Sequence, residues 1–156
     1  MTRAHRPTVL VVSQYAAVDR GGAERYRQEV SKRLPDYGFT LVDLSVDASD
    51  GIHPLTPPIR LSSAGLHWRW PRDIATILDR VAPDLIYAHA TVPFLVELTT
   101  LAAHRRGIPV CLMHHSAVTG PDPLRRSFAW VYNRSLGPMV VRRISELCVA
   151  SLDYAW

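Results

Sequence analysis

The chain is poor in lysine and in cysteine. Of its 18 basic residues only Lys32 is a lysine, and 14 acidic residues leave a formal net charge of +4. The arginines form no long run and no nucleic-acid-binding motif is present, so the sequence gives no support for a nucleic-acid partner. The two cysteines, Cys111 and Cys148, both lie in apolar segments. This placement predicts buried, reduced thiols in strands rather than a disulfide or a metal site.

Long apolar runs are also missing. Residues 1–7 are basic, and the apolar stretch that follows covers only Val9 to Val12. This stretch is too short for a signal peptide or a membrane span, so we expect a cytoplasmic protein. The 156 residues, 47% of them hydrophobic, are enough for one domain with a core but not for two domains of ordinary size.

Several well-known catalytic and binding motifs are absent. The sequence has no Gly-x-Gly-x-x-Gly, no P-loop Gly-Lys-Ser/Thr and no Gly-x-Ser-x-Gly, which argues against a standard dinucleotide site, a P-loop NTPase and a serine hydrolase. The neighbouring histidines His114 and His115 would point to opposite faces of a strand. No cysteine or carboxylate cluster completes a ligand set beside them, so we expect no metal.

Apolar runs alternate with amphipathic stretches along the chain. This alternation predicts an α/β fold, a single Rossmann-like doubly wound parallel sheet with crossover helices. Strands are expected at 8–15, 39–46, 59–61, 85–89, 109–114 and 147–150. Helices are expected at 23–34, 72–81, 93–106 and 123–136, with a further helical piece to about residue 145.

The helix expected at 123–136 carries a periodic set of apolar residues, spaced so that they share one side of the helix. We expect this side to face the core of the domain. Its members are Leu124, Phe128, Val131, Tyr132 and Leu136.

Three of the expected strands are followed by residues suited to ligand binding, at the ends where doubly wound sheets gather their ligands. Gly21 and Gly22 follow the first strand; two glycines let the backbone approach a diphosphate, although an ordinary tight turn is the alternative. His89 and His115 follow two other strands. Their imidazoles can face one cleft and exchange hydrogen bonds with a sugar hydroxyl, and a structural hydrogen-bonding role is the alternative.

Four segments, in order and with the appropriate spacing, resemble family-four retaining glycosyltransferases. Together they span nearly the whole chain. They are Gly21–Arg25 (GGAER) with 37–42 (YGFTLV), Pro83–His89 (PDLIYAH), Gly107–Val110 (GIPV) with His115 six residues after the proline, and 147–151 (LCVAS).

The resemblance implies a glycosyltransferase B fold, in which two Rossmann-like domains face each other across a cleft. Residues 1–156 would be the first, acceptor-side domain, and the C-terminal donor-binding domain would be absent. The implied site comprises Gly21 and Gly22 against the donor diphosphate, His115 as the catalytic residue beside the donor sugar, and His89, Tyr15, Thr91 and Ser116 on the acceptor side of the cleft.

The family transfers a sugar from a nucleotide donor with retention and needs neither a metal nor another cofactor. The resemblance therefore implies a nucleotide sugar and a glycoside or lipid-linked acceptor as substrates. Met113 and Ser116 depart from residues common in the family, which blurs the subfamily. We expect little turnover without a C-terminal domain in cis or in trans, whether the chain is a truncated piece, a proteolytic remnant or one subunit of a split enzyme.

Two other functions stay open from the sequence. One is a non-catalytic carbohydrate- or nucleotide-binding module of the same fold. The other is a different α/β enzyme with two such domains, for example a sugar-nucleotide epimerase, which would need other residues around His115.

The segment Leu66–Arg72 interleaves two tryptophans with basic residues. Such a segment suits a membrane interface or stacking on a sugar ring. The alternative, which we favour, is a loop whose tryptophans pack on the domain. If the segment were functional, a lipid-linked acceptor could reach it, with the protein at the inner face of the membrane.

Overall fold

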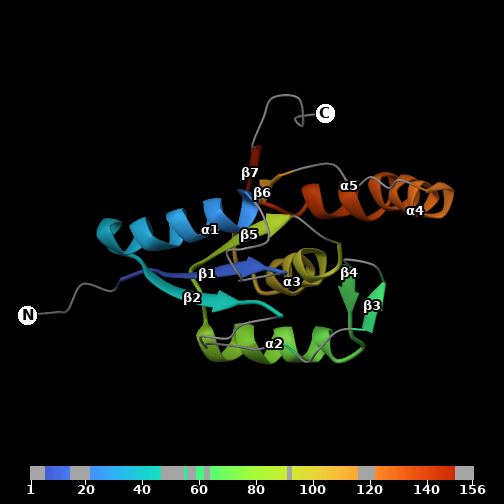
Figure 1. The fold of residues 1–156 in the computed structure, drawn as a ribbon. Helices are drawn as coiled ribbons and strands as arrows, with labels where there is room; N and C mark the ends of the chain where they lie inside the picture. Colours follow the sequence, from blue (N-terminus) through green and yellow to red (C-terminus); the bar gives the residue numbers. More distant parts are fainter. Residues whose placement is uncertain are drawn as a thin grey trace, which may run out of the picture.

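The computed structural model describes residues 6–14, 22–46, 55, 59–61, 64–90, 93–115 and 122–149. Within these ranges the chain forms a five-stranded parallel sheet with helices on both faces and a two-stranded hairpin beside it (Figure 1). The α/β class and the parallel sheet predicted from the sequence are confirmed.

The elements follow the expected order, with their ends shifted by a few residues. The sheet contains β1 (Thr8–Ser13), β2 (Thr40–Leu44), β5 (Leu85–Ala90), β6 (Val110–His114) and β7 (Glu146–Val149). The helices are α1 (Gly22–Arg33), the short 3-10 helix η2 (Leu34–Tyr37), α2 (Trp70–Val81), α3 (Leu95–His104), α4 (Pro123–Arg134) and α5 (Leu136–Val141). The sequence predicted β3 (Ile59–Leu61) but not β4 (Ala64–Leu66), with which it pairs in an antiparallel hairpin.

The order of the strands in the sheet is β2-β1-β5-β6-β7. Helix α1 leads from β1 outward to β2, whereas α2 leads back across β1 to β5, so the direction of winding reverses between β1 and β5. As a result α1 lies on one face of the sheet and α2 on the other (Figure 1). In doubly wound sheets this reversal opens a crevice at the carboxyl ends of the two strands, which is where ligands bind.

The hydrophobic core lies between the sheet and helices α2 and α3. In β1, Leu10 and Val12 join this core, whereas Val9 and Val11 are buried on the opposite face, because successive side chains of a strand alternate. Burial on both faces explains why this strand is a continuous apolar run in the sequence.

The two tryptophans of the segment Leu66–Arg72 have different environments. Trp70 begins α2 and is fully buried in the core, as the packing interpretation predicted. Trp68 is 74% exposed, so the same interpretation is wrong for it. Its ring stacks on His67 and lies 4.8 Å from the guanidinium carbon of Arg69.

Helix α4 buries only part of the side that the sequence assigned to the core, since Tyr132 is half-buried against Glu97 but other members of the set are exposed. Leu124 is 81% exposed and Val131 54%, and among the described side chains of α4 only Ala129 is buried. The physical reason is position: α4 extends beyond the sheet, where no layer of the described structure covers it (Figure 1). Periodicity identified an apolar face correctly, but the core environment that it assigned is wrong for the exposed members of the set.

The two cysteines lie on the neighbouring strands β6 and β7, with their sulfur atoms 3.8 Å apart and both thiols free. The strand assignment is confirmed, but the predicted burial is wrong, because Cys148 is exposed and Cys111 half-buried. Within the described part of the chain, β7 is the last strand of the sheet and has a neighbour on one side only. Burial raises the pKa of the Cys111 thiol to about 11.

Candidate ligand-binding site at the strand ends

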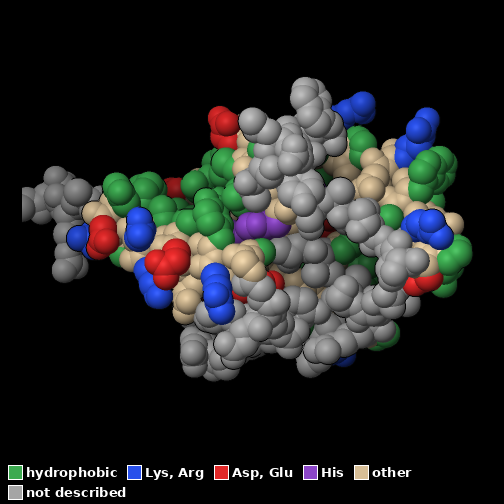
Figure 2. All heavy atoms as spheres, turned by 45° about the horizontal axis from the view of Figure 1, so that its top comes forward, with side chains coloured by type: hydrophobic (Ala, Val, Ile, Leu, Met, Phe, Trp, Pro, Cys, Tyr) green, Lys and Arg blue, Asp and Glu red, His purple; other side chains and the backbone are tan. Residues whose placement is uncertain are grey.

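The carboxyl ends of β1 and β5 bring together the first part of the site, at the point where the winding reverses. Ser13, the last residue of β1, pairs in register with His89 of β5. His115 follows β6, the next strand, directly. In a space-filling view histidine side chains reach the surface at the centre of this face (Figure 2). The structure therefore brings His89 and His115 together at one edge of the sheet.

His89 and His115 form a hydrogen-bonded pair. The Nδ1 atom of His89 lies 3.0 Å from Nε2 of His115, and the two rings stack with their centroids 5.3 Å apart. His89 is 1% exposed, whereas His115 is half-buried. His89 therefore lies behind His115, and only His115 is placed to touch a ligand.

Burial keeps both imidazoles neutral. Desolvation, assisted by His115 and Arg27, lowers the pKa of His89 to about 3. Desolvation also lowers the pKa of His115, against the opposing effect of the Glu24 carboxylate. A neutral imidazole has one N–H donor and one acceptor nitrogen, so the proton shared between the rings fixes the tautomer of His115. Its Nδ1 makes no hydrogen bond within the described chain and can act toward a ligand.

Two tyrosines, which the sequence analysis missed, hold the pair in place. Tyr26 of α1 makes edge contacts with both rings, at centroid distances of 6.2 Å to His89 and 5.9 Å to His115. Tyr87 contacts His89 at 4.6 Å. Burial and a hydrogen bond with Tyr26 raise the pKa of Tyr87. One signal was available: Tyr87 precedes His89 by two residues on one strand, so both side chains share a face.

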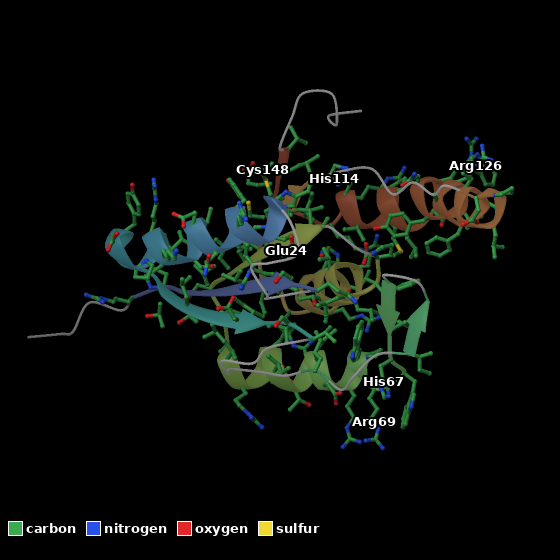
Figure 3. The ribbon with its side chains drawn as sticks, in the orientation of Figure 1. Glu24, His67, Arg69, His114, Arg126 and Cys148 are labelled. Atoms are coloured by element: carbon green, nitrogen blue, oxygen red, sulfur yellow. The ribbon has the colours of Figure 1, made fainter. Side chains whose placement is uncertain are left out.

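Helix α1 begins at Gly22, near the same strand ends. A Cβ atom added to Gly22 would meet no heavy atom within 4 Å, so the space in front of this residue is open. The unpaired N–H groups and the dipole at a helix N-terminus favour an anion there. Glu24 lies in the first turn of the helix and acts against an anion (Figure 3).

Gln14, directly after β1, is a further residue that the sequence analysis did not single out. Its side chain is 1% exposed, and neither its amide oxygen nor its amide nitrogen has a hydrogen-bond partner among the residues that the structure describes. A buried amide without partners is costly, so a ligand or water at this position would satisfy it. The available signal was a polar residue immediately after an apolar run.

The other predicted site residues, Tyr15, Gly21, Thr91 and Ser116, lie outside the described residues, and their roles stay predictions. Within the described ranges no three His, Cys, Asp or Glu side chains gather in a way that could hold a metal ion. That catalysis needs no metal is still a prediction.

Comparisons with known proteins agree on the architecture. Residues 20–152 match the family model described as Glycosyltransferase Family 4. No curated protein sequence matches the chain. Among solved structures, MurG of Acinetobacter baumannii aligns with a TM-score of 0.63 and 16% identity over 95% of this chain and 42% of that one. A GDP-L-fucose synthetase from Naegleria fowleri aligns with a TM-score of 0.41 and 9% identity, over 96% of this chain and 50% of that one.

These matches differ in what they show. The likeness to MurG confirms the fold, and this chain spans 42% of the length of that protein. The likeness to the synthetase is too low to support an argument. The family match covers most of the chain and contains the α1 N-terminus and both histidines of the pair. The chain therefore belongs to glycosyltransferase family 4, as a Rossmann-like domain of the glycosyltransferase B fold.

Proposed function

We propose that this chain is the acceptor-side domain of an enzyme that transfers a sugar from a nucleotide-sugar donor to an acceptor, with retention of configuration. One observation carries the proposal. A neutral, half-buried His115, which follows β6, and the open N-terminus of α1, which follows β1, lie at the carboxyl ends of the strands on the two sides of β5. A hydroxyl-binding group and an anion-binding group are what a sugar diphosphate needs.

In this proposal the donor diphosphate lies against the backbone of Gly21 and Gly22, and His115 Nδ1 bonds a hydroxyl of the donor sugar near the reaction centre. Helix dipoles and cationic side chains, rather than a metal, stabilise the departing diphosphate. Glu24 weakens anion binding at α1. We therefore infer that a second domain, in cis or in trans, supplies most of the positive charge and completes the site.

His89 acts indirectly in this proposal. Because it is 1% exposed and bonded to His115, it orients the His115 ring and fixes its tautomer instead of touching the acceptor itself. The acceptor, a glycoside or a lipid-linked sugar, approaches from the His115 side. We also propose a cytoplasmic location, where thiols such as those of Cys111 and Cys148 stay reduced.

The test measures turnover of UDP-, GDP- and dTDP-sugars by this chain alone and after addition of, or fusion to, its C-terminal half. We expect transfer only in the combined preparation. His115→Ala lowers kcat by about a hundredfold or more. His104→Ala is the matched control, because His104 is an exposed histidine at the end of α3. The anomeric configuration of the product, read by NMR, tests retention.

Gly22→Ala tests the diphosphate site separately. The new methyl group meets no protein atom within 4 Å, so the variant folds normally, but it occupies the space assigned to the diphosphate. We expect the KM for the donor to rise while the melting temperature stays unchanged. Absence of donor turnover in every preparation, together with glycoside binding by the chain alone, would replace this proposal with a non-catalytic binding module.

A further inference from the structure

Large exposed hydrophobic side chains gather at one end of the molecule. Four of them lie on α4, and three more lie in the β3–β4 hairpin and the turn that follows it. Figure 1 places α4 and the hairpin at the same end, toward which the strands β1, β2 and β5 point. Apolar surface gathered in this way is typical of an interaction site. The residues are Leu124, Phe128, Trp130 and Val131 on α4, and Ile59, Leu66 and Trp68.

Helix α4 carries an apolar face and two described arginines outside it. Leu124, Phe128 and Val131 follow each other at intervals of four and three residues, which aligns them along one side of the helix. Arg126 lies on the other side, whereas Arg134, three residues after Val131, lies at the edge of the apolar face. The guanidinium carbon of Arg134 is 5.7 Å from the ring centroid of Trp130. An exposed helix with an apolar face, arginines and a tryptophan has the character of an interfacial helix.

Arginine is the prevailing charged residue of this region, which Asp122 and Glu146 flank. From Pro123 to Ser145 the sequence contains five arginines and no aspartate or glutamate. In Figure 3, Arg126 points away from the body of the molecule. Figure 2 shows basic and hydrophobic side chains side by side at this end. A protein partner would have to neutralise each arginine that it buried, whereas an anionic lipid surface attracts all of them.

We propose that α4 is a docking surface for an anionic lipid membrane. The helix lies in the plane of the interface, with Leu124, Phe128 and Val131 in the acyl region and the arginines extended to the lipid phosphates. In the described ranges no helix combines the length and apolar character that crossing a bilayer requires. Docking by α4 is thus peripheral contact, and it brings the strand-end site to the surface that would carry a lipid-linked acceptor.

The inference deepens the proposed function by assigning the acceptor to a membrane, but its test does not depend on sugar transfer. The 156-residue chain is floated with vesicles of phosphatidylcholine, with and without phosphatidylglycerol, at low and high salt. Leu124→Ser/Phe128→Ser removes the apolar face, and Arg126→Gln/Arg134→Gln removes two charges. Tyr37→Ser and Arg80→Gln are the matched controls, because both residues are exposed and lie outside α4.

We expect the wild-type chain to bind the anionic vesicles and to lose binding at high salt, since screening weakens attraction between exposed charges. The apolar double variant should reduce partitioning about tenfold or more, and the charge variant about fivefold per arginine. Both controls should bind like the wild type. Circular dichroism melting checks that every variant is folded, which is expected because the altered side chains are exposed.

Two outcomes would overturn the inference. One is the absence of binding to anionic vesicles, or binding that the α4 variants leave unchanged. The other is self-association in analytical ultracentrifugation that disappears in Leu124→Ser/Phe128→Ser while vesicle binding is absent; a second copy of the chain would then cover α4. Vesicle binding in a protein without sugar transfer would leave the docking surface standing and remove the proposed function.

Discussion

The central strand β1 and helix α4 both carry a clear apolar pattern, but they lie in opposite environments. Leu10 of β1 is 0% exposed and Leu124 of α4 is 81% exposed. Strand β1 has a strand on each side and a helical layer over each face, whereas α4 lies beyond the sheet. The comparison teaches that periodicity identifies an apolar face but not what covers it. A face that the domain leaves uncovered is a candidate for a partner.

The largest expected effect is the difference in stability loss between a substitution in the core and one on α4. Trp70→Ala removes a fully buried side chain and should lower the free energy of unfolding by about 3–5 kcal/mol. Leu124→Ala removes an exposed one and should change it by less than about 0.5 kcal/mol. Urea denaturation measures both. If Trp70→Ala fails to fold, Ile86→Val should cost about 0.5–1.5 kcal/mol. Equal losses at Trp70 and Leu124 would refute the difference in burial.

The second prediction concerns pH. The folded-state pKa of His89, about 3, is below the ordinary value of 6.5, so at intermediate pH the unfolded chain binds the extra proton. Neutral His89 makes its full contribution to the free energy of unfolding above pH 6.5, and this contribution is lost as the pH falls toward 3. At about 1.4 kcal/mol per pH unit, roughly 2 kcal/mol is lost between pH 6.5 and 5.

His89→Gln provides the control for that titration, because glutamine keeps a polar side chain but does not titrate. Urea unfolding at a series of pH values should show a shallower slope below pH 6.5 for this variant than for the wild type. The same slope in both proteins would mean that His89 is not the buried neutral group described above.

A smaller effect is expected where α4 joins the domain. The hydroxyl of Tyr132 donates to the Glu97 carboxylate, which also accepts the N–H of Phe94 at 2.5 Å. Tyr132→Phe removes one donor to a buried acceptor and should cost about 1–3 kcal/mol. Amide hydrogen exchange should quicken in α4 and remain unchanged in α2. Unchanged exchange in α4 would show that this contact does not anchor the helix.

The smallest effect concerns the cysteines and involves no loss of stability. Cys148 is exposed, whereas Cys111 is half-buried with its pKa raised to about 11. The thiolate is the reactive species, so N-ethylmaleimide should modify Cys148 first. Peptide mass spectrometry over a time course measures the order. Faster labelling of Cys111 would mean that the β7 edge is covered in solution.

The sequence was sufficient to place the strand ends and the two histidines. The apolar strands are nearly continuous, and the rule that ligands gather at their carboxyl ends then selects His89 and His115. Their hydrogen bond could not be predicted, because it depends on the register in which His89 pairs with Ser13 on one side and Met113 on the other. The spacing of residues along the chain does not determine the register between strands that are distant in the sequence.

The sequence also could not predict the environments of single side chains. Trp68 and Trp70 are two residues apart in one motif, but one is exposed and the other is in the core, because α2 begins at Trp70 and turns it inward. Tyr26 lies within the helix expected at 23–34, but its contact with both histidines follows from the packing of α1 across the sheet, which the sequence does not show.

The central claim assigns chemistry to the strand ends and docking to α4, and one measurement tests both assignments. The chain, completed by its donor-binding domain, is given a membrane-borne acceptor and a water-soluble acceptor with the same headgroup. We predict that His115→Ala lowers transfer to both by about a hundredfold or more, while Leu124→Ser/Phe128→Ser lowers only transfer to the membrane-borne acceptor. The account would be contradicted if His115→Ala transferred sugar to both acceptors at the wild-type rate.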